Sequence, residues 1–166
     1  MRAETIYLVG FISAGKSSLA RELGRRLDWR VEDVDDRIEA REHMSISAIF
    51  SSKGEACFRA VEREIVRGLV GLKHAVVATG GGTFVDPDLR ALMKADGAVF
   101  WIDVPLDRII ARLPGDGSRP VASNRAEFER LYEVRRLAYA QAHVRLDGAR
   151  ASIGDLADQV VEWLGT

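Results

Sequence analysis

The segment from Gly10 to Ser17 carries the residues whose types and spacing most clearly indicate chemistry. Its sequence, GFISAGKS, satisfies the pattern G-x-x-x-x-G-K-[ST], in which backbone N–H groups of a glycine-containing loop point at phosphate oxygens. Lys16 would reach the β- and γ-phosphates, and Ser17 would offer its hydroxyl to Mg²⁺. An apolar run at 6–9 precedes the motif and an amphipathic pattern at 16–27 follows it, which is the context that the motif requires. The predicted nucleotide-binding residues here are Ser13, Ala14, Gly15, Lys16, Ser17 and Ser18.

Acidic residues lie at the end of the next expected strand, 29–34. Asp33 and Asp35 are two positions apart, so they share a face of an extended chain. Near a phosphate loop, one acid can hold the metal through water while another orients or deprotonates an acceptor hydroxyl. Aspartate is also a favoured N-cap, and Ile38 begins a periodic stretch. The sequence alone leaves both uses open.

Alternating strands and helices must position these residues. Apolar runs predict strands at 6–9, 29–34, 74–78, 98–104 and 143–146. The spacing of apolar residues predicts helices at 16–27, 55–72, 125–142 and 153–164. Two more helices are expected to begin at Pro87 and Pro105, because proline suits the first turn of a helix. This order favours an α/β fold, a three-layer α/β/α sandwich with a mostly parallel five-stranded sheet. Ligands of such sheets bind beyond the carboxyl ends of the strands. We expect one domain over residues 1–166.

Composition and charge argue against several classes of partner. The chain has 24 Lys and Arg against 25 Asp and Glu, a formal net charge of -1, which gives no basic field for nucleic acid or an anionic membrane. Neither a secretory signal nor a run of about 20 apolar residues is evident. Cys57 is the only cysteine, so no internal disulfide can form and a reducing compartment is the simpler interpretation. We expect a cytoplasmic monomer without nucleic-acid or membrane partners.

Several further motifs resemble those of shikimate kinases and follow the family's order from Val9 to about Tyr139. They are Asp33-Val34-Asp35 after the phosphate loop, SISAIF at 45–50, GEACFRAVE at 54–62 (G-E-x-x-F-R-x-x-E), the glycines at 80–82, Arg119-Pro120, and Arg135 followed by Tyr139. The resemblance implies a P-loop kinase fold with a lid at about 113–123. It also implies transfer of the γ-phosphoryl group of MgATP to the 3-hydroxyl of shikimate, in chorismate and aromatic amino-acid biosynthesis.

The same resemblance implies a role for individual residues. Asp35 would contact the shikimate hydroxyls and orient or accept a proton from the reacting one. Arg59 and Arg135 would hold the carboxylate, because a planar fork of donors suits that group. The remaining implied contacts are acceptor binding by Gly80, Gly81 and Gly82, with the Gly81 N–H as donor, magnesium binding by Asp33, and nucleotide binding by Arg119 and Arg112. Lys16, Mg²⁺ and Arg119 would supply positive charge during transfer.

Each assignment has a plainer alternative. Arg59 and Glu62, at i and i+3 on a helix, could form an ordinary surface ion pair. The three glycines could be only a flexible turn, Arg119 a solvated loop residue, and Arg135 or Arg136 part of a charged helix face. Together, these alternatives would have to reproduce the family's order and spacing by accident.

The chain departs from the family's pattern at four places. In the phosphate loop, Ser13 stands where glycine is usual, and just after the loop Ser18 stands where threonine is frequent. Val121-Ala122 follow the Arg-Pro pair in place of two leucines, and the proline expected after Arg136 is absent. Two other functions therefore remain as hypotheses. One is a related kinase for another small hydroxylated acid, such as gluconate. The other is a nucleotide-binding module without kinase activity.

Overall fold

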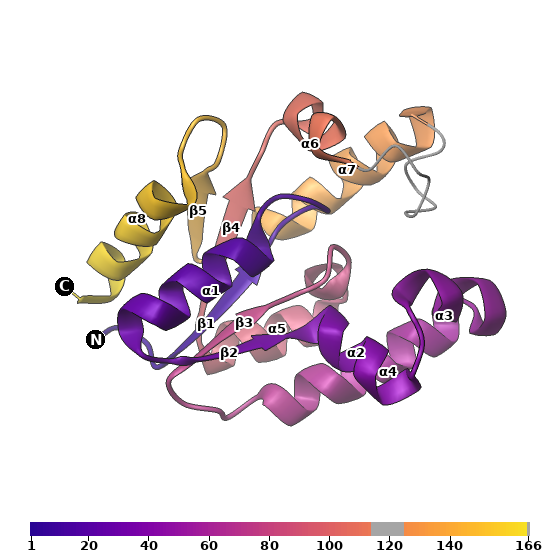
Figure 1. Ribbon diagram of the computed structural model, residues 1–166, viewed down its shortest axis with the longest axis horizontal. Coiled ribbons are helices and arrows are strands. Elements are labelled where there is room, and N and C mark those ends of the chain that lie inside the picture. The colour runs from indigo at the N-terminus through magenta and orange to yellow at the C-terminus, as the bar shows by residue number, and fades with distance from the viewer. Residues whose placement is uncertain (114–124, 166) are drawn as a thin grey trace.

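The computed structural model describes residues 1–113 and 125–165, and its strands and helices alternate as expected (Figure 1). The strands are β1 (Thr5–Val9), β2 (Arg30–Asp33), β3 (Ala75–Ala78), β4 (Ala98–Asp103) and β5 (Val144–Asp147). The helices are α1 (Lys16–Leu27), α2 (Val34–Glu42), α3 (Ile46–Lys53), α4 (Glu55–Leu69), the short 3-10 helix η1 (Thr83–Val85), α5 (Pro87–Asp96), α6 (Leu106–Arg112), α7 (Arg125–Tyr139) and α8 (Ile153–Gly165).

The five strands form one sheet in the order β2-β3-β1-β4-β5, and every neighbouring pair is parallel. All residues of β1, β3 and β4 are buried, which explains their nearly continuous apolar sequences. Because the strands are parallel, their carboxyl ends meet at the same edge. The segments that follow β1, β2 and β3 therefore lie beside one another, as the sequence predicted.

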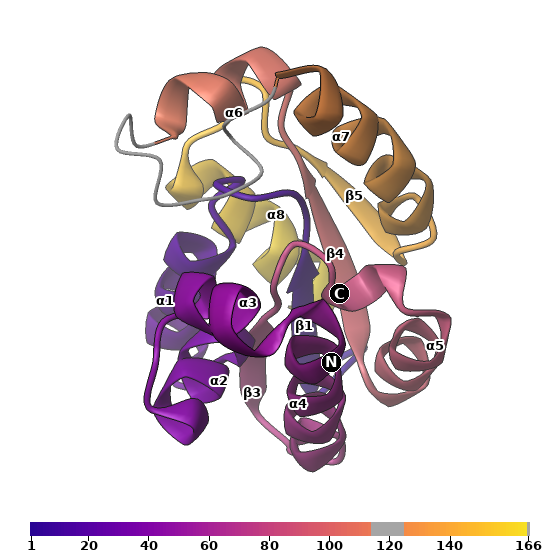
Figure 2. The ribbon, with the colours of Figure 1, turned by 90° about the vertical axis from the view of Figure 1, so that its right-hand side faces the viewer.

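Helices cover both faces of the sheet, which confirms the three-layer architecture (Figure 2). Successive side chains of β4 show the two layers, because neighbours on a strand point to opposite faces. The Phe100 ring contacts Trp163 of α8 with ring centroids 5.3 Å apart. The next residue, Trp101, contacts Tyr139 of α7, with centroids 6.1 Å apart. α8 lies beside α1 on the first face, whereas α4 and α5 share the second face with α7 (Figure 2).

The structure adds α3 and the short helix η1, neither of which the sequence analysis predicted, and shows that a helix, α2, follows the acidic strand end. It also shifts some boundaries. α3 begins after Ser45, whose hydroxyl accepts a hydrogen bond from the Ala48 N–H at 3.1 Å. It is short and only Ile49 is fully buried, so it lacks the periodic apolar stripe by which longer helices are recognised. α4 was expected to continue to residue 72 but ends at Leu69.

Residues 114–124, which include Arg119, Val121-Ala122 and nearly all of the expected lid, lie outside the described residues. The termini lie together (Figure 1), where the Arg2 N–H donates to the Leu164 carbonyl at 3.1 Å. Across the residues that are described, no helix has the length and apolar character needed to cross a bilayer.

Candidate active site

The phosphate loop leaves β1 and turns directly into α1. Its first residue, Gly10, has a φ of 153°, and a Cβ there would lie 2.9 Å from the Ile102 carbonyl oxygen on β4, so only glycine fits this close approach. The Lys16 ammonium is buried within the loop. It donates to the carbonyls of Gly10 at 2.6 Å and Phe11 at 2.8 Å. The loop thus holds a positive charge beside the N-terminus of a helix, an arrangement suited to phosphate.

Ser13 lies at the tip of this loop in a left-handed conformation, with φ of 60°. This conformation strains any residue with a Cβ, which explains why glycine suits the position. The carbonyl of Ser13 accepts a hydrogen bond from Arg112 Nη1 at 3.1 Å. Arg112, at the end of α6, therefore lies against the phosphate loop, although it is far away in the sequence.

Ser17 and Asp33 connect α1 to the end of β2. The Ser17 hydroxyl donates to Asp33 Oδ2 at 2.7 Å, while Asp33 Oδ1 accepts from the Asp36 N–H at 3.2 Å and caps α2. The structure therefore confirms that Asp33 caps a helix, and the second carboxylate oxygen lies beside the phosphate loop, where the predicted metal would bind. Ser18, next in the chain, is exposed, and its hydroxyl accepts from Arg21 at 3.4 Å.

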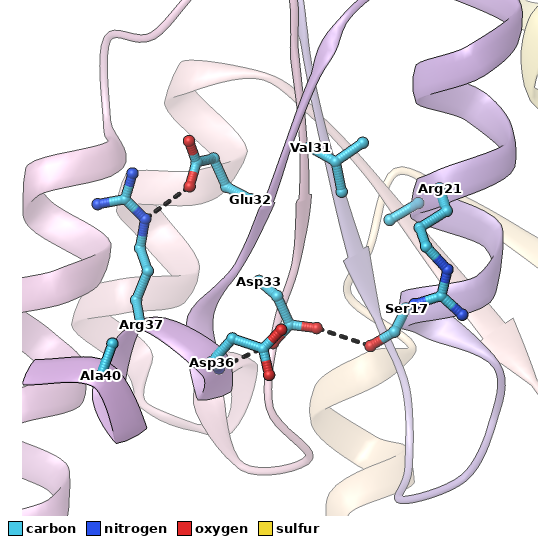
Figure 3. A pocket seen from close by; sticks show the side chains of 9 residues that line it. Ser17, Arg21, Val31, Glu32, Asp33, Asp36, Arg37 and Ala40 are labelled. Carbon is cyan, nitrogen blue, oxygen red and sulfur yellow. Dashed lines mark hydrogen bonds and ion pairs between the residues drawn. The ribbon is translucent and has the colours of Figure 1, made fainter. Parts of the chain in front are cut away.

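A hollow of about 360 Å³ opens beside this pair, between α1, β2 and α2 (Figure 3). Ser17, Asp33 and Asp36 lie on its wall. Partial burial, reinforced by the nearby charge of Asp33, raises the pKa of the Asp36 carboxyl. The wall of the hollow thus carries carboxylate and hydroxyl oxygens, the type of ligand that Mg²⁺ prefers, together with two arginines, Arg21 and Arg37. Residues expected to bind the acceptor do not line it.

The three expected acceptor-binding side chains converge on the glycine loop, Gly80–Gly82, which follows β3. A Cβ on Gly80 would lie 2.7 Å from Asp35 Oδ1, one on Gly81 would lie 3.0 Å from Arg135 Nη1, and one on Gly82 would lie 2.5 Å from Arg59 Nη2. Each glycine therefore leaves room for a different charged side chain. The same Cβ on Gly81 would lie 3.7 Å from the Ile12 nitrogen, so the acceptor side borders the phosphate loop.

A buried carboxylate holds Arg59 in place. Arg59 Nη1 donates to Glu62 Oε1 at 2.8 Å, and the side chain of Glu62 is only 1% exposed. The second oxygen, Glu62 Oε2, accepts from the Thr83 hydroxyl at 2.8 Å. The alternative of an ordinary surface ion pair is therefore wrong, because this pair belongs to a buried network under the glycine loop.

Arg135 and Arg136 are neighbours on α7 that point to different surroundings. Arg135 lies over the Phe11 ring, with Cζ 5.9 Å from its centre, and burial lowers the pKa of its guanidinium. Arg136 instead lies over Trp101 and 3.8 Å from Asp103 Oδ2. Of the two arginines, only Arg135 reaches the glycine loop, a distinction that the sequence could not make.

The structure thus gathers Lys16, Ser17, Asp33, Asp35, Arg59, Gly80–Gly82, Arg112 and Arg135 at the carboxyl ends of β1, β2 and β3, whereas Arg119 lies outside the described residues. Sequence reasoning missed the supporting residues Thr83 and Tyr139. The Tyr139 hydroxyl donates to the Gly81 carbonyl. Tyr139 was noted only as part of a motif, and Thr83 has no sequence signal beyond following three glycines.

Comparisons with known proteins point to one family. A profile of the family described as shikimate kinase matches residues 12–165. A shikimate kinase from Persephonella marina is 38% identical over 157 residues, which cover 94% of this chain and 96% of that protein.

Solved structures give the same result. A shikimate kinase from Acinetobacter baumannii, in complex with shikimate, superposes with a TM-score of 0.91 at 29% identity, covering 97% of this chain and 92% of the other. The crystal structure of shikimate kinase from Aquifex aeolicus gives a TM-score of 0.87 at 32% identity, covering 97% and 96%. The likeness therefore extends over nearly the whole of both chains.

Proposed function

The chain belongs to the shikimate kinase family, and from this premise we propose that it transfers the γ-phosphoryl group of ATP to the 3-hydroxyl of shikimate, in chorismate biosynthesis. The observation that carries the proposal is the convergence of Asp35, Arg59 and Arg135 on the glycine loop. This arrangement combines one carboxylate with two guanidinium groups beside a phosphate loop. It matches an acceptor that has both hydroxyls and a carboxylate.

Arg59 and Arg135 supply the carboxylate contact in this proposal. Two planar guanidinium groups can each donate paired hydrogen bonds to a carboxylate, which Lys cannot reproduce. They approach the loop from different helices, α4 and α7, so they hold the carboxylate from two directions. That geometry would fix the orientation of the ring and with it the hydroxyl that faces the nucleotide.

Asp35 acts on the reacting hydroxyl. Its Oδ1 lies at the surface of the glycine loop nearest Gly80. In the transfer step the acceptor oxygen forms a bond to the γ-phosphorus, the bond from this phosphorus to the β–γ bridging oxygen breaks, and ADP leaves. The proton of the hydroxyl passes to Asp35. Since such transition states are loose and highly charged, the protein contributes mainly by positioning and neutralising.

Lys16 and two further arginines balance the negative charge that develops on the phosphates. Lys16 lies inside the phosphate loop, and Arg112 donates a hydrogen bond to the carbonyl of Ser13 at the tip of this loop. Arg119 belongs to the lid proposed at about 113–123, whose closure would exclude water and prevent hydrolysis of ATP without an acceptor.

Magnesium is the metal that these residues fit. Ser17 Oγ and Asp33 Oδ2 are 2.7 Å apart, and Mg²⁺ is usually held by one or two protein oxygens, water and the substrate phosphates. When bound, the ion neutralises charge on the β- and γ-phosphates. Ser17 would bind it directly, and Asp33 would hold it through water.

We further propose that the protein works as a cytoplasmic monomer.

An acceptor panel tests the proposal. Purified protein with MgATP is given shikimate, gluconate or another small hydroxylated acid, and ADP release is followed by a coupled assay. Shikimate should give the highest kcat/KM. Strong turnover of a different acid with none of shikimate would overturn the choice of acceptor. Nucleotide binding in calorimetry without ADP formation for any acceptor would instead indicate a module that has lost its kinase activity.

A further inference from the structure

The Thr83 hydroxyl connects two groups that the proposed reaction uses. Thr83 is fully buried, with 0% of its surface exposed. Its Oγ1 donates to Glu62 Oε2 at 2.8 Å and accepts from the Gly80 N–H at 2.9 Å. The direction of both bonds is fixed, because a carboxylate can only accept and a backbone N–H can only donate. A single hydroxyl therefore satisfies two buried partners.

One partner, Glu62, connects Thr83 to Arg59, the residue proposed to bind the carboxylate of the acceptor. Glu62 uses its other oxygen to accept from Arg59 Nη1 at 2.8 Å. A buried carboxylate oxygen that loses its hydrogen bond is costly to leave unpaired. Without the Thr83 hydroxyl, Glu62 would have to move or recruit water, and Arg59 would move with it.

The other partner, Gly80, lies next to Asp35, the residue proposed to bind the hydroxyls of the acceptor. Gly80 is the glycine whose Cβ position lies 2.7 Å from Asp35 Oδ1. The position of its backbone therefore decides how closely Asp35 approaches the loop. On the far side of the loop, the Tyr139 hydroxyl donates to the Gly81 carbonyl. The helices that carry Arg59 and Arg135 thus each hold the glycine loop, α4 through Thr83 and α7 through Tyr139.

We propose that Thr83 is a positioning residue for the acceptor, which sets the separation between the Arg59 anchor and the Asp35 end of the site. This inference rests on the proposed function, because it assigns Thr83 to the acceptor half of that site. The Thr83 hydroxyl is engaged by Glu62 and Gly80. It acts through Glu62 and Gly80.

The test compares Thr83→Val with Thr83→Ser and Thr83→Cys. Valine keeps the shape of threonine but removes both hydrogen bonds, serine keeps both, and cysteine offers only weak ones. We expect the KM for shikimate to rise by about tenfold in Thr83→Val, to stay near the wild-type value in Thr83→Ser, and to fall between these in Thr83→Cys. The KM for ATP should stay unchanged in all three variants. If Thr83→Val does not fold, Thr83→Cys carries the comparison.

Thr79→Val is the matched control. Thr79 is also buried, but its hydroxyl donates to the Leu8 carbonyl of β1 at 2.8 Å. Loss of the Thr79 hydroxyl should lower the stability of the protein without changing the KM for shikimate. A smaller fraction of folded molecules lowers only the apparent kcat. A wild-type KM for shikimate in both Thr83→Val and Thr83→Cys would overturn the positioning role. Failure of the wild-type protein to use shikimate would instead overturn the proposed function.

Discussion

The hydroxyl of Ser17 donates a hydrogen bond to Asp33 Oδ2 across 2.7 Å, and so joins the first turn of α1 to the end of β2. The second oxygen of the same carboxylate caps α2. Asp33 therefore has an observed role as a helix cap and a proposed role in magnesium binding. These two contributions can be separated, because asparagine is as good an N-cap as aspartate but carries no charge.

Asp33→Asn should keep the fold and raise the Mg²⁺ concentration that gives half-maximal turnover. The physical reason is that the neutral amide attracts the ion and its water less strongly than a carboxylate does. We expect a shift of about tenfold, equivalent to roughly 1.4 kcal/mol, measured by titrating Mg²⁺ at saturating ATP and shikimate. Asp88→Asn, an exposed position in the first turn of α5, is the control. An unchanged Mg²⁺ requirement in Asp33→Asn would remove Asp33 from the metal site.

Lys16→Ala and Asp35→Asn should each nearly abolish turnover while the protein remains folded. In the proposed mechanism Lys16 supplies charge where the phosphates bind, and Asp35 orients and deprotonates the acceptor. Loss of either contribution should lower kcat by about 10²–10⁴. Circular dichroism and thermal unfolding check the fold, and the coupled ADP assay measures the rate. Lys53→Ala, which removes only an exposed partner of Glu42, should retain activity. Full activity in either test variant would exclude that residue from the mechanism.

Arg135→Lys should raise the KM for shikimate by about tenfold or more while the KM for ATP stays constant, because an ammonium cannot form the paired hydrogen bonds of a guanidinium. Its neighbour provides a close control. Arg136→Lys makes the same change one residue later on α7, where the side chain faces Trp101 and Asp103. Equal effects of the two substitutions on the KM for shikimate would contradict the assignment.

Ser13→Gly should stabilise the protein by about 0.5–1 kcal/mol. Relief of the left-handed strain at φ 60° is worth roughly 1–2 kcal/mol, and the greater freedom of glycine in the unfolded chain offsets about half of it. Thermal or denaturant unfolding measures the change. His43→Gly, at φ 55° at the end of α2, should give a similar gain away from the phosphate loop. Destabilisation by Ser13→Gly would mean that the serine side chain makes a contact worth more than the strain.

The free energy of unfolding should decrease as the pH is lowered below about 6.5, because of His143. The Nδ1 atom of His143 accepts a hydrogen bond from the Val99 N–H at 3.0 Å. Burial, helped by the charge of Lys94, lowers the pKa of His143 from its ordinary value of 6.5. The unfolded chain then binds the proton more readily, so this stabilisation is complete above pH 6.5 and is lost as the pH falls through the folded-state pKa. Denaturant unfolding between about pH 7.5 and 5 should show a steeper loss for the wild type than for His143→Gln. Parallel curves would rule out this contribution.

Much of the fold and the identity of most site residues could be predicted from local sequence. The buried strands appear in the sequence as apolar runs, and α1, the helix that follows the phosphate loop, is recognisable from the spacing of its apolar residues. Short α3 was missed because one buried side chain makes no periodic pattern. The site residues could be named because they occur in motifs of fixed spacing, each within one segment of the chain.

What the sequence by itself determined is therefore local: a phosphate loop, an acidic strand end, and the resemblance that named Arg59 and Arg135. Which side chains meet depended on the tertiary structure. Only the packing of α4 and α7 against the loop after β3 buries Glu62, directs Arg135 rather than Arg136 to Gly81, and places the Thr83 hydroxyl between Glu62 and Gly80. The hydrogen bond from Tyr139 of α7 to Gly81 likewise joins residues 58 positions apart. No local spacing rule links residues that meet only when the sheet brings its strand ends together.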